Sequence, residues 1–143
     1  MELTPFFKSV LEQDRAPIVL CDLQNVIVYM NPAAIRRYAS RGGAALLGRS
    51  LLDCHGTASR KIIGEVLDWF AKDRTHNSVY ESRNAAENKD VYMVALRDEN
   101  GSLIGYYEKH EYRTPETAAF YDFSPAAEAG TAGRTGEAAG EQT

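Results

Sequence analysis

The stretch PIVLCDLQNVIVYMNP, residues 17–32, holds two short apolar runs separated by a turn. Residues 17–21 and 26–30 are rich in Val and Ile, and Asp22 and Asn25 bound the turn between them, a pattern typical of two strands in a tight hairpin. Pro17 is tolerated because it is the first residue of its strand. Asn31 is a good helix N-cap and Pro32 fits the first helical position, so we expect a helix to begin there.

Helical patterns lie on both sides of this hairpin. Before it, Thr4 is expected to cap a helix that starts at Pro5, with an apolar stripe of Phe6, Phe7, Val10 and Leu11. After it, residues 44–47 predict a short helical turn, and Thr57 or Ser59 is expected to cap a longer helix. Apolar residues recur along this longer helix at helical spacing, with Trp69 at their border: Ile62, Ile63, Val66, Leu67 and Phe70.

Three further strands are expected at residues 76–83, 90–97 and 103–112. Asn100-Gly101 between the last two predicts a type I′ hairpin turn, which requires a positive φ at both residues. A five-stranded antiparallel sheet has one apolar face to bury, and the helices in the middle of the chain are the cover available to it. The sequence therefore predicts an α+β fold. Strand alternation places either Tyr106 or Tyr107 inward, and the sequence leaves open which of the two.

The chain divides into three parts by composition. Residues 1–113 are expected to form one domain, and residues 114–123 a short extension that opens with a capped helical turn at Thr114-Pro115-Glu116. Apart from Pro125, residues 124–143 hold no apolar side chain larger than Ala, so they are expected to be a disordered tail.

Charge and composition exclude several classes of protein. A net charge of −4 argues against nucleic-acid binding, which depends on Lys and Arg at phosphates. No apolar run is long enough for a membrane span, and the charged N-terminal residues argue against a signal peptide. Two cysteines make no disulfide framework. We therefore expect a cytoplasmic protein with reduced thiols.

Three segments in this order resemble the PAS family of sensory domains. They are NVIVYMNPAA (25–34), LLGRSLLD (46–53) and LRDENGSLIGYYE (96–108). The resemblance covers about residues 1–113 and implies the PAS fold, a five-stranded antiparallel sheet covered on one face by helices. The chain also resembles small stand-alone bacterial PAS proteins and a bacterial subgroup with a Cys-His-Pro motif, although Gly56 follows Cys54-His55 here.

The PAS resemblance implies a pocket between the inner sheet face and the central helices. Such pockets hold haem, flavin, small acids or lipids, or are filled by side chains. The resemblance also implies a homodimer formed through the N-terminal helix, which signals to a separate effector protein. The pocket is expected under Cys54, His55 and the helix of residues 59–70. Its candidate lining also includes four aromatic residues: Tyr38, Trp69, Tyr92 and Tyr107.

Cys54-His55 admits three interpretations: a structural pair, a ligand or cofactor contact, or a redox thiol. Thiolate and imidazole are good metal ligands, but Cys21, Cys54, His55, His76 and His110 lack the paired spacing of a zinc site. No metal site is therefore expected, and His55 is the one residue placed to ligate a haem. Photochemical flavin binding is disfavoured, because Ser50-Leu51-Leu52 replaces the Asn-Cys-Arg motif of the LOV photosensors.

The leading hypothesis is a non-enzymatic sensory module that binds a small molecule such as haem or an organic ligand, whose identity the sequence leaves unknown. Two alternatives stay open. One is a thiol-dependent redox enzyme that uses Cys54, and the other is a ligand-free scaffold for protein interaction.

Overall fold

The computed structural model describes residues 1–125, apart from the side chain of Cys54. Most of the expected disordered tail, from residue 126 on, lies outside the described residues. The chain divides into two compact units, Met1–Tyr112 and a second that begins at Arg113. In the second unit residues 114–123 form no helix, which corrects the expected helical turn, and the Glu116 carboxylate accepts a hydrogen bond from the Thr117 amide instead.

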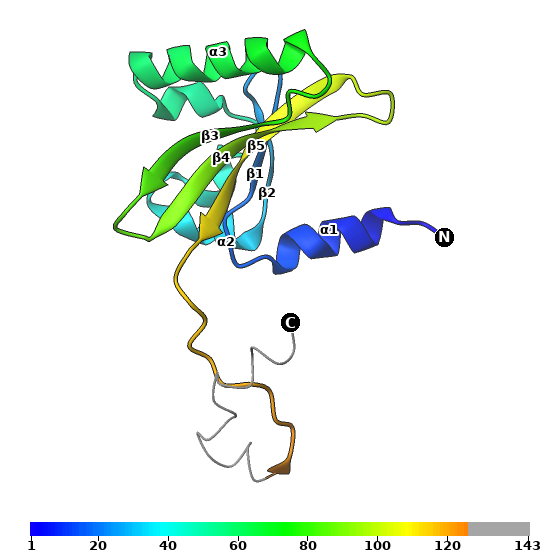
Figure 1. The fold of residues 1–143 in the computed structure, drawn as a ribbon, viewed down its shortest axis with the longest axis vertical. Helices are drawn as coiled ribbons and strands as arrows, with labels where there is room; N and C mark the ends of the chain where they lie inside the picture. The colour runs from blue at the N-terminus through cyan, green and yellow to red at the C-terminus, as the bar shows by residue number, and fades with distance from the viewer. Residues whose placement is uncertain (126–143) are drawn as a thin grey trace. The chain divides into compact units, whose positions relative to one another are not determined.

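Five antiparallel strands form the sheet of the first unit, in the order β2-β1-β5-β4-β3 (Figure 1). Their bounds are β1 Val19–Asp22, β2 Ile27–Met30, β3 Ser78–Asn84, β4 Lys89–Arg97 and β5 Leu103–Tyr112. The two hairpins β1–β2 and β4–β5 come from the segments that predicted them. The central strand β5 joins these hairpins by pairing with both β1 and β4. The expected α+β class and five-stranded antiparallel sheet are confirmed.

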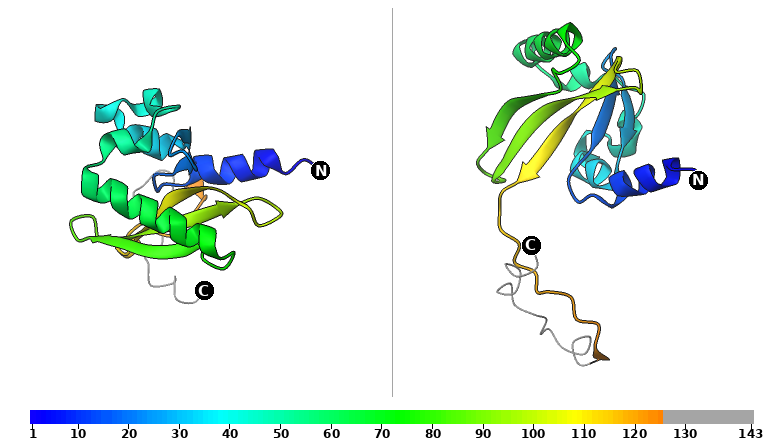
Figure 2. Two further views of the ribbon diagram at one scale, coloured as in Figure 1. Left: turned by 90° about the horizontal axis from the view of Figure 1, so that it is seen from above. Right: turned by 45° about the vertical axis from the view of Figure 1, so that its right-hand side comes forward.

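The helices α2 and α3 and the short turns between them lie on one side of the sheet (Figure 2). Their bounds, with those of the first helix, are α1 Thr4–Gln13, α2 Pro32–Arg37, the 3-10 turns η1 Ala39–Arg41, η2 Gly43–Leu46 and η3 Leu51–Cys54, and α3 Thr57–Lys72. Within residues 1–125, none of the helices is both long and apolar enough to cross a bilayer.

Two helix starts differ from the expectation. Thr4 and Thr57 are the first helical residues rather than the caps, because Leu3 and Gly56 occupy the cap positions without side-chain bonds. The buried face of α3 also holds fewer residues than the sequence pattern predicted. Ile63 and Phe70, seven residues apart, are buried, whereas Ile62 is 51% exposed because neighbouring residues point about 100° apart on a helix.

The β4–β5 turn lies where expected but is not of type I′. Only Gly101 has a positive φ, of 82°, while Asn100 does not. The Asp98 carboxylate accepts hydrogen bonds from the amides of Asn100 and Ser102, at 2.9 and 3.0 Å, and the Gly101 amide donates to the Asp98 carbonyl. This side-chain bonding favours a type I turn followed by a left-handed glycine.

The core lies between the inner sheet face and the helices. Met93, Tyr106 and Cys21 fill its sheet side, while Phe70 of α3 and Ala34 of α2 close it from the other. Tyr106 is therefore the inward tyrosine of β5. At Gly105 the backbone of β5 approaches β1 so closely that a Cβ atom would lie 2.1 Å from the carbonyl oxygen of Cys21.

Asn31 is fully buried and ties the helices to the sheet with its side chain. Its Oδ1 accepts from the amides of Ile18 and Ala34, both at 2.9 Å, which also caps α2. Its Nδ2 donates to the carbonyls of Leu11 and Ala16 at 3.0 Å and to that of Asp14 at 3.3 Å. This amide thus joins the end of α1, the start of β1 and the start of α2. We name these five bonds the Asn31 clasp.

Asn31→Ala is expected to lower the free energy of unfolding by about 3 kcal/mol, because it leaves several buried backbone groups without partners. Urea denaturation of the full chain measures this. Asn100→Ala, in the exposed β4–β5 turn, is the matched control and should change stability by less than about 0.5 kcal/mol. Equal losses in both variants would contradict the role of the clasp.

Candidate functional site

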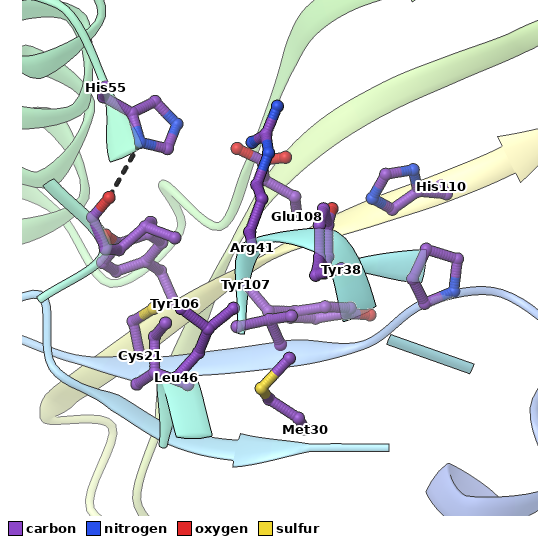
Figure 3. Close-up of a pocket in the computed structure, with 14 residues that line it drawn as sticks. Cys21, Met30, Tyr38, Arg41, Leu46, His55, Tyr106, Tyr107, Glu108 and His110 are labelled. Atoms are coloured by element: carbon purple, nitrogen blue, oxygen red, sulfur yellow. Dashed lines mark hydrogen bonds between the residues drawn. The ribbon is translucent and has the colours of Figure 1, made fainter. Parts of the chain in front are cut away.

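A cavity of about 130 Å³ opens on the inner sheet face (Figure 3). The strands β1, β2 and β5 form its floor, and Tyr38 at the C-cap of α2 forms its roof together with the turns that follow. Its lining residues are Pro17, Val19, Cys21, Ile27, Met30, Tyr38, Arg41, Leu46, Leu51, His55, Tyr106, Tyr107, Glu108 and His110. Polar and apolar side chains are segregated: His55, Arg41, Glu108 and His110 lie on one side, and Cys21, Leu46 and Met30 on the other.

The side chains at the apolar end of the cavity are unreactive. Burial raises the pKa of the Cys21 thiol to about 12, so this cysteine stays protonated and unreactive at neutral pH. Burial likewise raises the pKa of Tyr106, whose hydroxyl donates to the Asn25 side chain at 2.7 Å. These groups therefore present a neutral, apolar surface to the cavity.

His55 lies at the mouth of the cavity, directly after η3. Its Nδ1 lies 2.9 Å from the carbonyl oxygen of Leu51, so Nδ1 carries the proton and donates. The Nε2 atom takes no part in this contact. Local backbone geometry, rather than a distant partner, thus orients this histidine.

Glu108 lies between the apolar floor and the basic end of the sheet face. It shares a hydrogen bond with Glu81 of β3, and burial together with this neighbouring carboxylate raises the pKa of Glu81 to about 7. Two carboxyl groups this close resist double ionisation. Near neutral pH, therefore, the pair readily holds one proton between its members.

His110 follows Glu108 by two residues and lies on the same sheet face. Its Nδ1 is buried and has no hydrogen-bond partner in the described part of the chain. Burial, followed by the charges of Lys89 and Arg37, lowers the pKa of His110 to about 4, so the ring is neutral at physiological pH. A buried polar atom without a partner is uncommon in proteins. This nitrogen is available to a bound molecule.

The roof is fastened to the far end of the sheet by an ion pair. Arg37 at the end of α2 donates two hydrogen bonds to the Glu87 carboxylate, at 2.6 and 2.8 Å. Lys89 lies 3.2 Å from the same carboxylate. A two-point arginine–carboxylate contact fixes orientation as well as distance. The position of α2 over the cavity is thereby set from both of its ends.

The structure brings three of the six expected site residues to this cavity. Tyr38, His55 and Tyr107 line it, and their role in binding stays a prediction. The side chain of Cys54 lies outside the described part of the chain, so its expected role also stays a prediction.

Trp69 and Tyr92 do not line the cavity, which corrects their expected placement. The Trp69 ring stacks on His76 with centroids 3.9 Å apart. Tyr92 lies between the buried residues Val91 and Met93, so strand alternation turns it to the opposite sheet face. None of the described residues of α3 lines the cavity. Arg97 holds the end of that helix at the β4–β5 turn by donating to the Phe70 carbonyl at 2.7 Å.

Sequence reasoning did not identify Arg41, Glu108 or His110 as site residues. Glu108 and His110 continue the parity of the inward Tyr106, so two polar residues follow an aromatic one on a buried face. That spacing could have predicted the inward face of β5, but charged residues occur on both faces of the strand and made the two faces look alike. Within the described residues, no group of three His, Cys, Asp or Glu side chains could hold a metal ion.

The family profile described as "PAS domain" matches residues 7–109 of this chain. No curated protein matches the sequence. Several solved structures are similar, among them a C-terminal domain from Streptococcus mutans, with 17% identity, 87% of each chain covered and a TM-score of 0.57.

Two further similar structures are PAS domains. One comes from Colwellia psychrerythraea, with 14% identity over 78% of this chain and 97% of that chain, and a TM-score of 0.57. The other is the PAS domain of BvgS from Bordetella pertussis, with 18% identity over 78% and 86% and a TM-score of 0.55. At these identities the similarity shows the shared fold.

Glu81→Gln tests the carboxyl pair. The folded protein retains a proton on Glu81 between its ordinary pKa of 4.5 and about 7, whereas the unfolded chain releases it. The contribution of Glu81 to the free energy of unfolding is therefore present below about pH 4.5 and is lost as the pH rises through about 7. Relative to that of the wild type, the free energy of unfolding of the variant should therefore be higher at pH 8 than at pH 4.

Urea denaturation at the two pH values measures this gain. The opposite trend that His110 contributes is common to both proteins and cancels in their difference. Glu99→Gln makes the same change of charge at an exposed position and should show no such gain. A difference independent of pH would show that Glu81 titrates normally.

Proposed function

This chain belongs to the PAS domain family, and from that we propose that it is a sensory module whose cavity binds a small molecule and which signals to a separate effector protein. The observation that carries this proposal is the cavity itself, which combines an apolar floor with a polar rim. Binding sites for small molecules have this composition, with a few polar groups placed to fix orientation. The proposed activity is binding and not catalysis.

The volume of the cavity limits its occupant. About 130 Å³ is less than the ~300 Å³ at which pockets for drug-sized ligands begin, and close to the ~150 Å³ of a cavity that admits benzene. A haem or flavin ring system is too large for this space, even though His55 lies at its mouth. The ligand that fits is a compact organic molecule with one ring or a branched chain.

The helix α1 supports the proposal of a homodimer. It has no buried residue, and its apolar side chains Phe6, Phe7 and Val10 are all more than half exposed. The helix is nevertheless held in place by the Asn31 clasp and by a 2.9 Å hydrogen bond from the Tyr29 hydroxyl to Glu12. A fixed helix with an uncovered apolar stripe is typical of an interaction surface. The partner we propose is a second copy of this chain.

Two neighbouring leucines allow a matched test of the cavity. Leu46 lines it and is 8% exposed, whereas Leu47 is 45% exposed and does not line it. Benzyl alcohol, titrated into the full chain and followed by NMR chemical shifts, should perturb residues around the cavity. Leu46→Trp should weaken this binding at least about 10-fold by filling the space, and Leu47→Trp should leave it unchanged.

Native mass spectrometry of the purified protein supplements this titration by detecting any molecule retained from the cell. Circular dichroism checks that both variants fold. If benzyl alcohol binds equally to both leucine variants, or does not bind at all, the cavity is not a ligand site and the scaffold alternative is favoured.

The dimer has its own test. Phe7→Glu places a charge in the exposed stripe and should convert a dimer into a monomer at micromolar concentration, as measured by light scattering after size exclusion. Lys8→Glu changes a neighbouring exposed residue of the same helix and should leave the dimer intact. A wild-type protein that is monomeric under these conditions would refute the proposed homodimer.

A further inference from the structure

The sheet splits at one end, between β1 and β5. These strands pair over three residues, Leu20 with Tyr107, Cys21 with Tyr106 and Asp22 with Gly105, whereas β5 continues to Tyr112 beside β4. At this end of β1 the Ile18 amide donates to the Asn31 side chain and the Ile18 carbonyl accepts from the Asn31 amide, so Ile18 bonds to Asn31 and not to β5. The divergence of the β1–β2 hairpin from β5 is visible in the right-hand view of Figure 2.

A second cavity, of about 100 Å³, lies at this split. Its lining residues are Asp14, Ala16, Pro17, Ile18, Tyr107, Glu108, Lys109 and His110. It shares Pro17, Tyr107, Glu108 and His110 with the first cavity. The two cavities therefore adjoin, and together they lead from the apolar floor to the segment that connects α1 with β1.

The groups around the split favour a cation. The acidic residues Asp14 and Glu108 both line it, and Glu108 lies beside the carboxyl group of Glu81. The buried Nδ1 of His110, without a partner in the described part of the chain, lines both cavities and can accept a hydrogen bond when Nε2 carries the proton. Glu108 and the Nδ1 of His110 thus offer two acceptors to the space, and Asp14 adds a negative charge at its edge.

Three nearby positive charges contact other carboxylates. Lys109 lies 2.8 Å from Glu111, and Arg37 and Lys89 both contact Glu87. Arg41 is exposed and lines the first cavity but not the second. A ligand that carries a carboxylate would therefore meet repulsion from Glu108, while a ligand that carries an ammonium group would relieve the repulsion between Glu108 and Glu81.

We propose that the ligand is a small primary amine whose apolar body fills the first cavity and whose ammonium group lies in the split, beside Glu108 and the Nδ1 of His110 and near the negative charge of Asp14. This inference rests on the proposed ligand-binding function and names the chemical class that the site selects. An ammonium ion offers three donors, so it can serve the Glu108 carboxylate and the Nδ1 of His110 at once. Its apolar body matches the surface formed by Cys21, Met30 and Leu46.

Three probes of one skeleton and different charge test the class: benzylamine, benzyl alcohol and benzoate. Dissociation constants are measured on the full chain by NMR titration at neutral pH and low ionic strength. Benzylamine should bind about 10-fold more tightly than benzyl alcohol, since a charge-assisted hydrogen bond exceeds a neutral one by about 1.4 kcal/mol. Benzoate should bind more weakly than either.

Glu108→Gln should weaken benzylamine binding about 10-fold and so remove its preference over benzyl alcohol. Asp14→Asn, which retains the oxygen that accepts from the Ala16 amide, should weaken benzylamine binding about 3-fold. Glu99→Gln, at an exposed position in the β4–β5 turn, is the control for net charge and should change nothing. Added salt should weaken the binding of benzylamine more than that of benzyl alcohol.

The outcomes separate this inference from the proposed function. If benzyl alcohol binds and benzylamine binds no more tightly, the amine class is wrong while the binding function stands. A preference for benzylamine that survives Glu108→Gln would also overturn the assigned position of the ammonium group. If no probe binds, the proposed ligand-binding function is wrong, and so is this inference.

Discussion

The structure depends on one buried amide. The side chain of Asn31 makes five hydrogen bonds, to the end of α1, the connection into β1 and the first turn of α2. Each bond satisfies a backbone group that burial would otherwise leave without a partner. Ile18, whose amide donates to the Asn31 side chain, lies where β1 and β5 part. A single residue thus holds the end of α1, the start of β1 and the start of α2 together at the point where the sheet opens.

The second constraint is the alternation along β5. Tyr106, Glu108 and His110 face the helices from one strand. An aromatic ring, a carboxyl group and a neutral imidazole therefore follow one another across the cavity. Their neighbours on β4 are the partly buried Ala95 and the buried residues Met93 and Val91. Burial is the first cause of the shifted pKa values of both Glu81 and His110. The polar chemistry of the site therefore depends on a core position in the middle of the sheet and not on a surface loop.

Local features of the sequence predicted much of the fold. The bounds of β5 agree with the expectation, and the Asn31-Pro32 start of α2 was expected from its capping chemistry. Short-range patterns could not predict contacts between distant segments, such as Glu81 with Glu108 or Arg37 with Glu87, nor the inward parity of β5. The aromatic residues Trp69 and Tyr92 were misplaced for the same reason, because their surroundings depend on how α3 and β4 pack.

The short pairing of β1 with β5 makes the sheet two sub-sheets joined by a narrow seam. One sub-sheet is the β1–β2 hairpin, and the other is the β3–β4–β5 ladder, which pairs over much longer lengths. The close backbone approach at Gly105 is one end of this seam. A joint of three residue pairs resists twisting far less than the nine-pair ladder between β4 and β5, so backbone bonding attaches the β1–β2 hairpin to the rest of the sheet over a short length only.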